Sequence, residues 1–217
     1  MTTAKKSRDE GEITRLRTRL FLVASLTSHN GLAHLASALT AGDIASVLIA
    51  EPAVEGKAFA SLVRPFVELA QEHDAAVILR GEARLVQRFG ADGFHSDGDI
   101  AALEEVIEAL SPGLIVGAAN LATRHAAMEA GEAGADYVFF GTPDEGRTND
   151  FGMLLERAEW WQSLFVAPCV MCAPDLASVG ALARAGADFV ALGPRTWRGG
   201  DDIRAAQSAI DAAFAGS

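Results

Sequence analysis

Side chains that suit a hard cation form the densest polar cluster of the chain, His95-Ser96-Asp97-Gly98-Asp99. Mg²⁺ binds carboxylate oxygens and commonly takes one or two carboxylates together with substrate phosphate. One interpretation is therefore a Mg²⁺ site held by the two carboxylates of this turn, Asp97 and Asp99, with Asp99 as the assigned ligand and His95 beside the substrate. The alternative is an Asx turn in which Asp99 caps the helix that follows.

A second polar segment, Gly193-Pro194-Arg195-Thr196, suits an anion. Backbone N–H groups ahead of a helix favour negative charge, and the Arg195 guanidinium adds a planar fork of donors. Pro194 removes one N–H from the turn. The segment predicts a phosphate site that includes Gly193 and Arg195. A surface turn with a solvated arginine is the alternative.

Three further places carry side chains for binding or catalysis. The run from Gly141 to Thr148 is long for a loop, and long loops in compact domains tend to be lids or binding loops. Its Arg147 and Thr148 are candidates for substrate binding, and so is Arg80. Glu51 is the best-placed general base, which an isomerase of phosphorylated metabolites would need.

These residues follow a regular alternation of two patterns that begins at Leu20. Apolar runs rich in Val, Ile, Leu and Phe are typical of parallel strands covered on both faces. They predict strands over 20–24, 45–50, 76–79, 93–95, 114–117, 137–141, 165–171 and 189–193. Patterns rich in Ala, Leu and Glu predict helices over 31–41, 56–73, 82–89, 99–110, 122–133, 150–162, 175–186 and 201–215.

The tripeptide Gly-Ala-Asp occurs at 90–92, 134–136 and 186–188, each time after a predicted helix and before a predicted strand. Its glycine supplies the left-handed stop of the helix. Evenly spaced strand–helix units with short connections predict an α/β fold, a closed (β/α)8 TIM barrel over residues 20–217. An open doubly wound sheet is the alternative, although no G-x-G-x-x-G follows the first strand.

A barrel of this kind carries its function at the carboxyl ends of the strands. All the candidate residues above lie at the end of a predicted strand or in the loop after it, and the loops after strands seven and eight are the customary phosphate site. Residues 1–19 are polar and lack an apolar period, so they predict a flexible N-terminal arm.

Length and charge limit the function further. The chain has 217 residues, half of them hydrophobic, and a net charge of −11. Nucleic acid needs a clustered basic surface, so it is excluded as a partner. No apolar run reaches the roughly 18 residues that span a bilayer, and no apolar stretch follows the basic N-terminus. We predict a cytoplasmic protein with a small phosphorylated substrate and no membrane partner; a homo-oligomer stays open.

Cys169 and Cys172 have the C-x-x-C spacing of a redox pair or half a zinc site. They lie in an apolar run that predicts a strand, where residues three apart point to opposite faces. A redox pair normally begins a helix, and a second ligand pair is missing. The spacing therefore favours two small buried residues.

The chain resembles the thiamine phosphate synthases and their sister branch, the thiazole tautomerases. The resemblance is clearest in Ala91-Asp92-Gly93-Phe94-His95, in 130–137 and in Leu20-Phe21-Leu22-Val23. It implies a (β/α)8 barrel. It also implies a reaction in which a pyrimidine methyl diphosphate joins a thiazole phosphate and releases pyrophosphate with the help of Mg²⁺.

Several of the family's motifs are replaced in this chain. The Gln-Leu-Arg-x-Lys that grips diphosphate after strand two reads Val47, Leu48, Ile49 and Glu51. The Asn-Asp after strand three, whose Asp binds metal, reads Arg80 and Gly81. The Thr-x-Thr-Lys loop after strand six reads Gly146, Arg147, Thr148 and Asn149, and the Gly-Gly after strand seven falls near Cys172-Ala173. Thr148 and the second metal carboxylate, Asp99, are retained, whereas Leu121 stands where the tautomerases have a histidine.

The replaced motifs bear on the reaction because a departing diphosphate develops negative charge that the site must neutralise. Each lost electrostatic contact costs on the order of 3 kcal/mol in the transition state. Two hypotheses follow. The chain is a thiamine phosphate synthase whose anion site is rebuilt from Arg80, Arg147 and Arg195. Alternatively, it is a divergent barrel that has lost this reaction and binds another phosphorylated or heterocyclic ligand.

Overall fold

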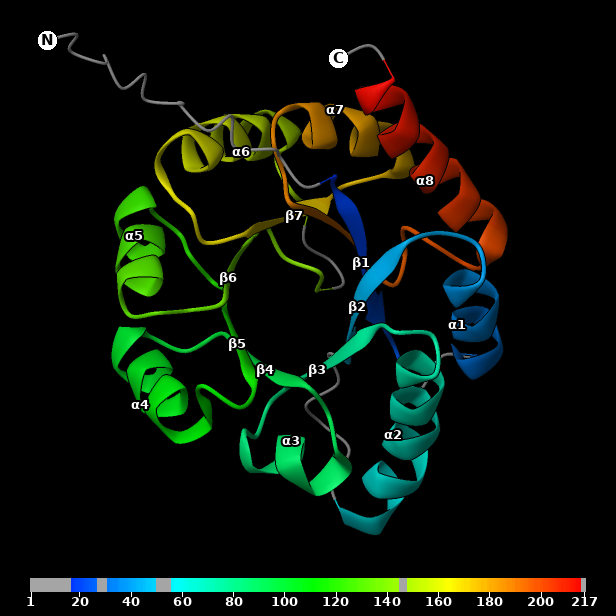
Figure 1. Cartoon of the computed structure of the whole chain (residues 1–217), viewed down its shortest axis with the longest axis vertical. Coiled ribbons are helices and arrows are strands. Elements are labelled where there is room, and N and C mark those ends of the chain that lie inside the picture. Colours follow the sequence, from blue (N-terminus) through cyan, green and yellow to red (C-terminus); the bar gives the residue numbers. More distant parts are fainter. Residues whose placement is uncertain (1–16, 27–30, 50–55, 145–147, 216–217) are drawn as a thin grey trace, which may run out of the picture.

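Eight parallel strands form a closed barrel in the computed structural model, which describes residues 17–26, 31–49, 56–144 and 148–215, with the backbone alone for 56–60. Each strand pairs with the next along the chain, and the first strand also pairs with the last. The helices surround this ring of strands (Figure 1). The predicted (β/α)8 TIM barrel is therefore confirmed.

The strands and helices alternate without interruption through the described residues. The strands are β1 (Arg19–Ala24), β2 (Ile44–Ile49), β3 (Ala76–Arg80), β4 (Gly93–Ser96), β5 (Ile115–Ala118), β6 (Tyr137–Phe140), β7 (Cys169–Ala173) and β8 (Phe189–Leu192). The helices are α1 (Gly31–Leu39), α2 (Gly56–Gln71), α3 (Arg84–Phe89), α4 (Ile100–Leu110), α5 (Arg124–Glu132), α6 (Phe151–Leu164), α7 (Val179–Arg184) and α8 (Gly200–Phe214). A 3-10 turn, Leu176–Ser178, precedes α7.

The strands are apolar along their whole length because both of their faces are buried. Alternate residues point to opposite faces of a strand. Leu20 and Leu22 of β1 pack in the layer between the barrel and its helices, whereas Phe21 and Val23 pack inside the barrel. This arrangement removes apolar area from water on both faces, at about 25 cal/mol per Å², and accounts for the uninterrupted hydrophobic runs.

An aromatic cluster fills the barrel interior. Phe21 meets Tyr137 and Phe139 edge to face, with ring centroids 5.8 and 5.9 Å apart. Gly117 on β5 makes room for the Tyr137 ring, since a Cβ at that position would lie 1.9 Å from Tyr137 Cζ. The interior is therefore a packed core, and a ligand can enter only at the ends of the barrel.

The three Gly-Ala-Asp repeats perform two tasks. Their glycines, Gly90, Gly134 and Gly186, have φ values of 68°, 94° and 100°, as the predicted helix stop requires. Their aspartates accept a hydrogen bond from a backbone N–H near the start of the preceding strand. The pairs are Asp92 with Val77 N at 2.7 Å, Asp136 with Val116 N at 2.8 Å and Asp188 with Cys169 N at 2.8 Å. The repeat thus closes one strand–helix unit and anchors the strand before it.

The largest boundary error concerns β7, which begins at Cys169 rather than at Phe165 as predicted. Phe165 instead stacks on Trp161 with ring centroids 4.1 Å apart. Val166 is 101% exposed, and Pro168 has no N–H for a strand ladder. The apolar run therefore begins in the residues that follow α6 and continues through a loop before β7 begins.

The predicted N-terminal arm falls mostly on residues 1–16, which lie outside the described residues. Its last residues are described and belong to the barrel. Thr18 is buried and donates a hydrogen bond to Ala187 O at 2.7 Å, and Arg19 is the first residue of β1. The prediction of a flexible arm therefore concerns only the segment before Arg17.

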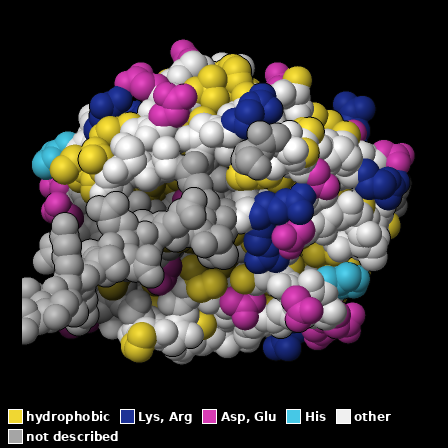
Figure 2. Space-filling model, turned by 45° about the horizontal axis from the view of Figure 1, so that its top comes forward, with side chains coloured by type: hydrophobic (Ala, Val, Ile, Leu, Met, Phe, Trp, Pro, Cys, Tyr) yellow, Lys and Arg dark blue, Asp and Glu magenta, His cyan; other side chains and the backbone are white. Residues whose placement is uncertain are grey.

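Two observations concern the surface of the described residues. Among these residues, no helix is long and apolar enough to cross a membrane. On the face shown in Figure 2, acidic and basic side chains lie interspersed over the part that is not grey.

We expect Asp188→Ala to lower the free energy of unfolding by about 1–3 kcal/mol, because it leaves the buried N–H of Cys169 without its acceptor. Asp188→Asn keeps an acceptor oxygen and should lose less. Urea denaturation with an unchanged m value measures both effects. The exposed Glu104→Ala serves as the control, at about ±0.5 kcal/mol. A loss for Asp188→Ala that is no larger than this control would contradict the anchoring role.

Candidate functional site

Two adjoining pockets lie at the carboxyl ends of the strands and together form the mouth of the barrel. The pocket of about 240 Å³, here the Arg195 pocket, is lined by Thr142, Pro143, Asp144, Thr148, Asn149, Cys172, Ala173, Pro174, Gly193, Pro194, Arg195 and Thr196. The pocket of about 260 Å³, here the Arg80 pocket, is lined by Arg80, His95, Asp97, Ala119, Asn120, Gly141, Thr142, Pro143 and Asp144. They share Thr142, Pro143 and Asp144, so the loop after β6 is their common wall.

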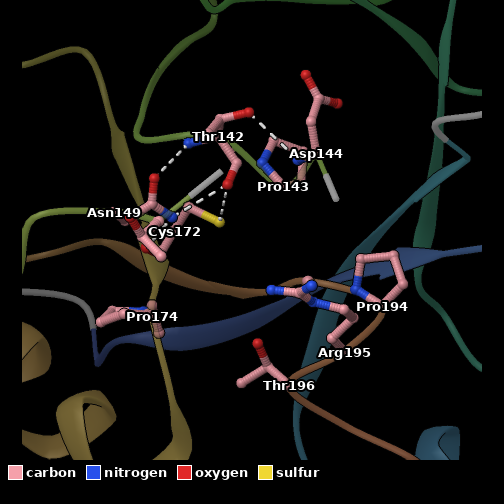
Figure 3. Close-up of a pocket in the computed structure, with 12 residues that line it drawn as sticks. Thr142, Pro143, Asp144, Asn149, Cys172, Pro174, Pro194, Arg195 and Thr196 are labelled. Atoms are coloured by element: carbon pink, nitrogen blue, oxygen red, sulfur yellow. Dashed lines mark hydrogen bonds between the residues drawn. The ribbon is translucent and has the colours of Figure 1, made fainter. Parts of the chain in front are cut away.

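The Arg195 pocket is formed by the loops that follow β6, β7 and β8. After β8, Thr196 N donates to Gly193 O at 2.9 Å, which closes a tight turn around Pro194 and Arg195. Figure 3 shows the Arg195 side chain extending from this turn toward the residues of the other two loops. Among the described lining residues, Arg195 alone is cationic. The pocket thus combines a guanidinium, hydroxyls and backbone N–H groups, as an anion requires.

Asn149 connects the loop after β6 to the end of β7. Its Oδ1 accepts from Thr142 N at 2.8 Å, and its Nδ2 donates to Thr142 O and to Cys172 O, both at 3.0 Å (Figure 3). One side chain therefore fixes the loop after β6 against the end of β7. Asn149 is a positioning residue for the pocket wall, which sequence reasoning did not identify.

In the Arg80 pocket, one guanidinium holds two carboxylates. Arg80 Nη2 and Nε lie 2.7 and 2.9 Å from Asp97 Oδ2, and Nη1 lies 2.6 Å from Asp144 Oδ1. Burial alone would lower the pKa of Arg80, but the hydrogen bonds to Asp144 and Asp97 raise it above its ordinary value. Arg80 is therefore a permanent cation, and its charge is already matched by two anions.

His95 lies at the floor of the Arg80 pocket and is 2% exposed. Its Nδ1 is 2.8 Å from the Tyr137 hydroxyl. Burial, followed by the positive charge of Arg80, lowers the pKa of His95 to about 4. Burial also raises the pKa of Tyr137, with a further contribution from Asp136. Near pH 7 the hydrogen bond therefore joins two neutral groups.

Asn120, on the wall of the same pocket, has a left-handed backbone with φ of 59°. A residue other than glycine adopts this conformation at a cost of about 1 kcal/mol or more, and such residues cluster at functional sites. Its Nδ2 lies 3.5 Å from Asp97 O. The strained residue thus borders the segment that carries the carboxylate of Asp97.

Asp99 caps α4, because its Oδ1 accepts from Ala102 N at 3.0 Å. It lies outside the two mouth pockets and lines a neighbouring cavity of about 330 Å³ beside α4 and α5. Within the described ranges, no group of three or more His, Cys, Asp or Glu side chains could hold a metal ion. The cap expected as the alternative is present, and a role of Asp99 as a metal ligand stays a prediction.

The structure brings the predicted substrate-binding residues together in two sets. Thr148, Gly193 and Arg195 line one pocket, and Arg80 and His95 line the other. Arg147 and Glu51 lie outside the described residues. Sequence reasoning missed Asp144 as the partner of Arg80, and no local signal could reveal it because 64 positions separate the two residues.

The two cysteines face opposite sides of β7, as predicted. Cys169 packs in the outer layer and Cys172 inside the barrel, and both are buried and outside any disulfide. Burial raises the pKa of the Cys172 thiol to about 12, although a hydrogen bond with Asn149 opposes the shift. A protonated thiol is a poor nucleophile and metal ligand, so the pair has a packing role.

Known proteins resemble this chain in sequence and in fold. A family model described as thiamine monophosphate synthase matches residues 20–194. Thiamine-phosphate synthases from Erythrobacter litoralis and Hyphomonas neptunium are both 35% identical to it, over 91% and 92% of this chain and 95% of each relative. A thiamine phosphate pyrophosphorylase structure from Pyrococcus furiosus has a TM-score of 0.71 at 18% identity, covering 90% of this chain and 96% of its own. At that identity the structural likeness establishes the fold alone.

The pH dependence of stability tests the environment of His95. In the unfolded chain the His95 imidazole has its ordinary pKa of 6.5, whereas in the folded chain its pKa is about 4. Between these values the unfolded state holds more protons, so the free energy of unfolding falls as the pH is lowered, by up to about 1.4 kcal/mol per pH unit. The His95→Gln variant lacks the imidazole of His95 but keeps all the other titratable groups. Urea denaturation from pH 7 to pH 4 should show a steeper loss for the original protein, and parallel curves would exclude a buried neutral His95.

Proposed function

The chain belongs to the thiamine monophosphate synthase family, and we propose that it binds a small phosphorylated substrate at the mouth of its barrel. The family model covers residues 20–194, which include all of the Arg80 pocket and all of the Arg195 pocket except Arg195 and Thr196. The observation that carries the proposal is the Arg195 pocket. It is lined by the Arg195 guanidinium, by two threonines of the loop after β6 and by the turn after β8.

In this proposal the phosphate lies in the Arg195 pocket. Arg195 donates to it through its fork of N–H groups, and the hydroxyls of Thr148 and Thr196 add further donors. The Arg80 pocket is less suitable for an anion because Arg80, Asp97 and Asp144 together carry one net negative charge. The remainder of the substrate would extend past Thr142 and Pro143, the shared wall, toward His95.

The first candidate reaction is that of the family, in which a pyrimidine methyl diphosphate joins a thiazole phosphate. Negative charge develops on the departing diphosphate, so cations at the mouth stabilise the transition state. Arg195 is positioned to supply one of them. The resemblance also implies Mg²⁺, but the described carboxylates do not fit a metal site, since Asp97 and Asp144 hold Arg80 and Asp99 caps α4. We therefore assign no step to a metal ion.

The second candidate is a divergent member that binds a different phosphorylated or heterocyclic ligand. The pairing of Arg80 with two carboxylates favours it, because this arginine cannot neutralise a diphosphate without breaking both ion pairs. A cytoplasmic location, expected from the sequence, belongs to the proposal under either candidate, and the question of a homo-oligomer stays open under both.

An assay of the purified protein distinguishes the two candidates. With pyrimidine methyl diphosphate, thiazole phosphate and Mg²⁺, the first candidate predicts thiamine phosphate above the protein-free background. We expect the protein to form this product, and we expect the Arg195→Ala variant to form less of it. If no product forms while thiazole phosphate or a sugar phosphate raises the melting temperature, the second candidate is correct. If there is neither product nor stabilisation by any phosphorylated compound, the proposed substrate class is wrong.

Phosphate binding in the Arg195 pocket is measured by calorimetry with thiazole phosphate or inorganic phosphate. Arg195→Ala removes a charged hydrogen bond worth about 1.5–3 kcal/mol, so we expect Kd to rise by about 10- to 100-fold. Arg204→Ala is the matched control. It removes the same charge from the exposed surface of α8, where Arg204 pairs with Asp201. Equal effects of the two substitutions would show that net charge, and not the pocket, controls binding.

A further inference from the structure

The positive charge between the carboxylates of the Arg80 pocket is the guanidinium of Arg80 itself. The Arg80 side chain begins at the end of β3, and it contacts one carboxylate that follows β4 and another that follows β6. These three strands do not all neighbour one another in the barrel. Arg80 therefore connects the end of β3 to the loops that follow β4 and β6.

We propose that the Arg80 guanidinium takes the place of a divalent cation between Asp97 and Asp144, so that the mouth of this barrel is metal-independent. Two carboxylates from separate loops that face a common point are a usual basis for a divalent oxygen-ligand site. Here that point is occupied by a side chain that stays charged at every physiological pH. The proposal shares its location with the proposed function but does not depend on which substrate binds.

The geometry of the contacts supports this replacement. Asp97 Oδ2 accepts from two guanidinium nitrogens, at 2.7 and 2.9 Å, and Asp144 Oδ1 accepts from the third, at 2.6 Å. All three nitrogens are thereby used, and one oxygen of each carboxylate already accepts from the guanidinium. Each of these distances is within the range of strong charge-assisted hydrogen bonds.

Burial distinguishes this group from an ordinary surface ion pair. The Arg80 side chain is 19% exposed, whereas its two partners are 46% and 40% exposed. Exposed pairs contribute little to stability, but a mostly buried guanidinium between two carboxylates is screened much less by water. A second cation entering the same place would meet that charge at close range and at reduced dielectric.

The charge balance also favours a single built-in cation. The three side chains have one net negative charge, and the neighbouring His95 is neutral because burial lowers its pKa to about 4. Without Arg80, the two carboxylates would lose the guanidinium that lies between them. Such a pair of carboxylates attracts Mg²⁺ or Mn²⁺.

Removing Arg80 should therefore create a metal site that the original protein lacks. Titration of Mn²⁺ into the protein without substrate, followed by the EPR signal of the free ion, measures this directly. We expect no site in the original protein and one site in Arg80→Gln, with Kd on the order of 10⁻⁴–10⁻³ M, as in weak oxygen-ligand sites. Arg195→Gln is the matched control, since it makes the same change of charge in the adjoining pocket. It should gain no site.

Two further variants make the outcome decisive. Asp97→Asn combined with Arg80→Gln should abolish the new site. Mn²⁺ binding by the original protein that is lost in Asp99→Asn would overturn the proposal and support Asp99 as a metal ligand. Failure of Arg80→Gln to bind Mn²⁺, with circular dichroism showing an intact fold, would also overturn it. If Arg80→Gln does not fold, the comparison of the original protein with Asp99→Asn still tests the proposal. Because no substrate is present, none of these results depends on the proposed function.

Discussion

A closed parallel barrel requires every buried strand amide to have a hydrogen-bond acceptor, including those at the amino ends, where the ladder begins. Asp92, Asp136 and Asp188 meet this requirement for β3, β5 and β7. Each aspartate stands directly before the following even-numbered strand. The carboxylate therefore links the starts of two neighbouring strands and helps to set their register. The opposite ends of those strands carry the mouth, so its geometry depends on these contacts at the far side of the barrel.

The two described arginines of the mouth, Arg80 and Arg195, differ in what their charge contacts. Arg80 is mostly buried and bound to Asp97 and Asp144, so its charge organises the protein. Arg195 is on a tight turn at the edge of a polar pocket, where its charge is available to a ligand. The loop after β6 lies between them and is fixed by Asn149. Substrate recognition and internal charge balance thus share one wall while depending on different side chains.

The sequence predicted the barrel because the relevant signals are local. Apolar runs, helical periods and the Gly-Ala-Asp repeats each depend on neighbouring residues, and even the opposite orientations of Cys169 and Cys172 follow from the strand period. The β7 boundary was wrong because hydrophobicity alone does not distinguish a strand from the packed end of a helix, where Phe165 stacks on Trp161. The site was predicted residue by residue but not as a set of contacts. Nothing local relates Arg80 to Asp144, which approach each other only when the barrel closes.

The hydrogen bonds of Asn149 limit which side chains this position can accept. The resemblance to the thiamine phosphate synthases places a lysine at this position, and this chain has instead an amide that makes three hydrogen bonds to two loops. A single change back to lysine would restore a cation but lose the acceptor for Thr142 N and disturb the wall of the Arg195 pocket. A lysine at this position would therefore destabilise the loop after β6. Divergence at this position is therefore difficult to reverse in single steps, and the neighbouring loops would have to change together with it.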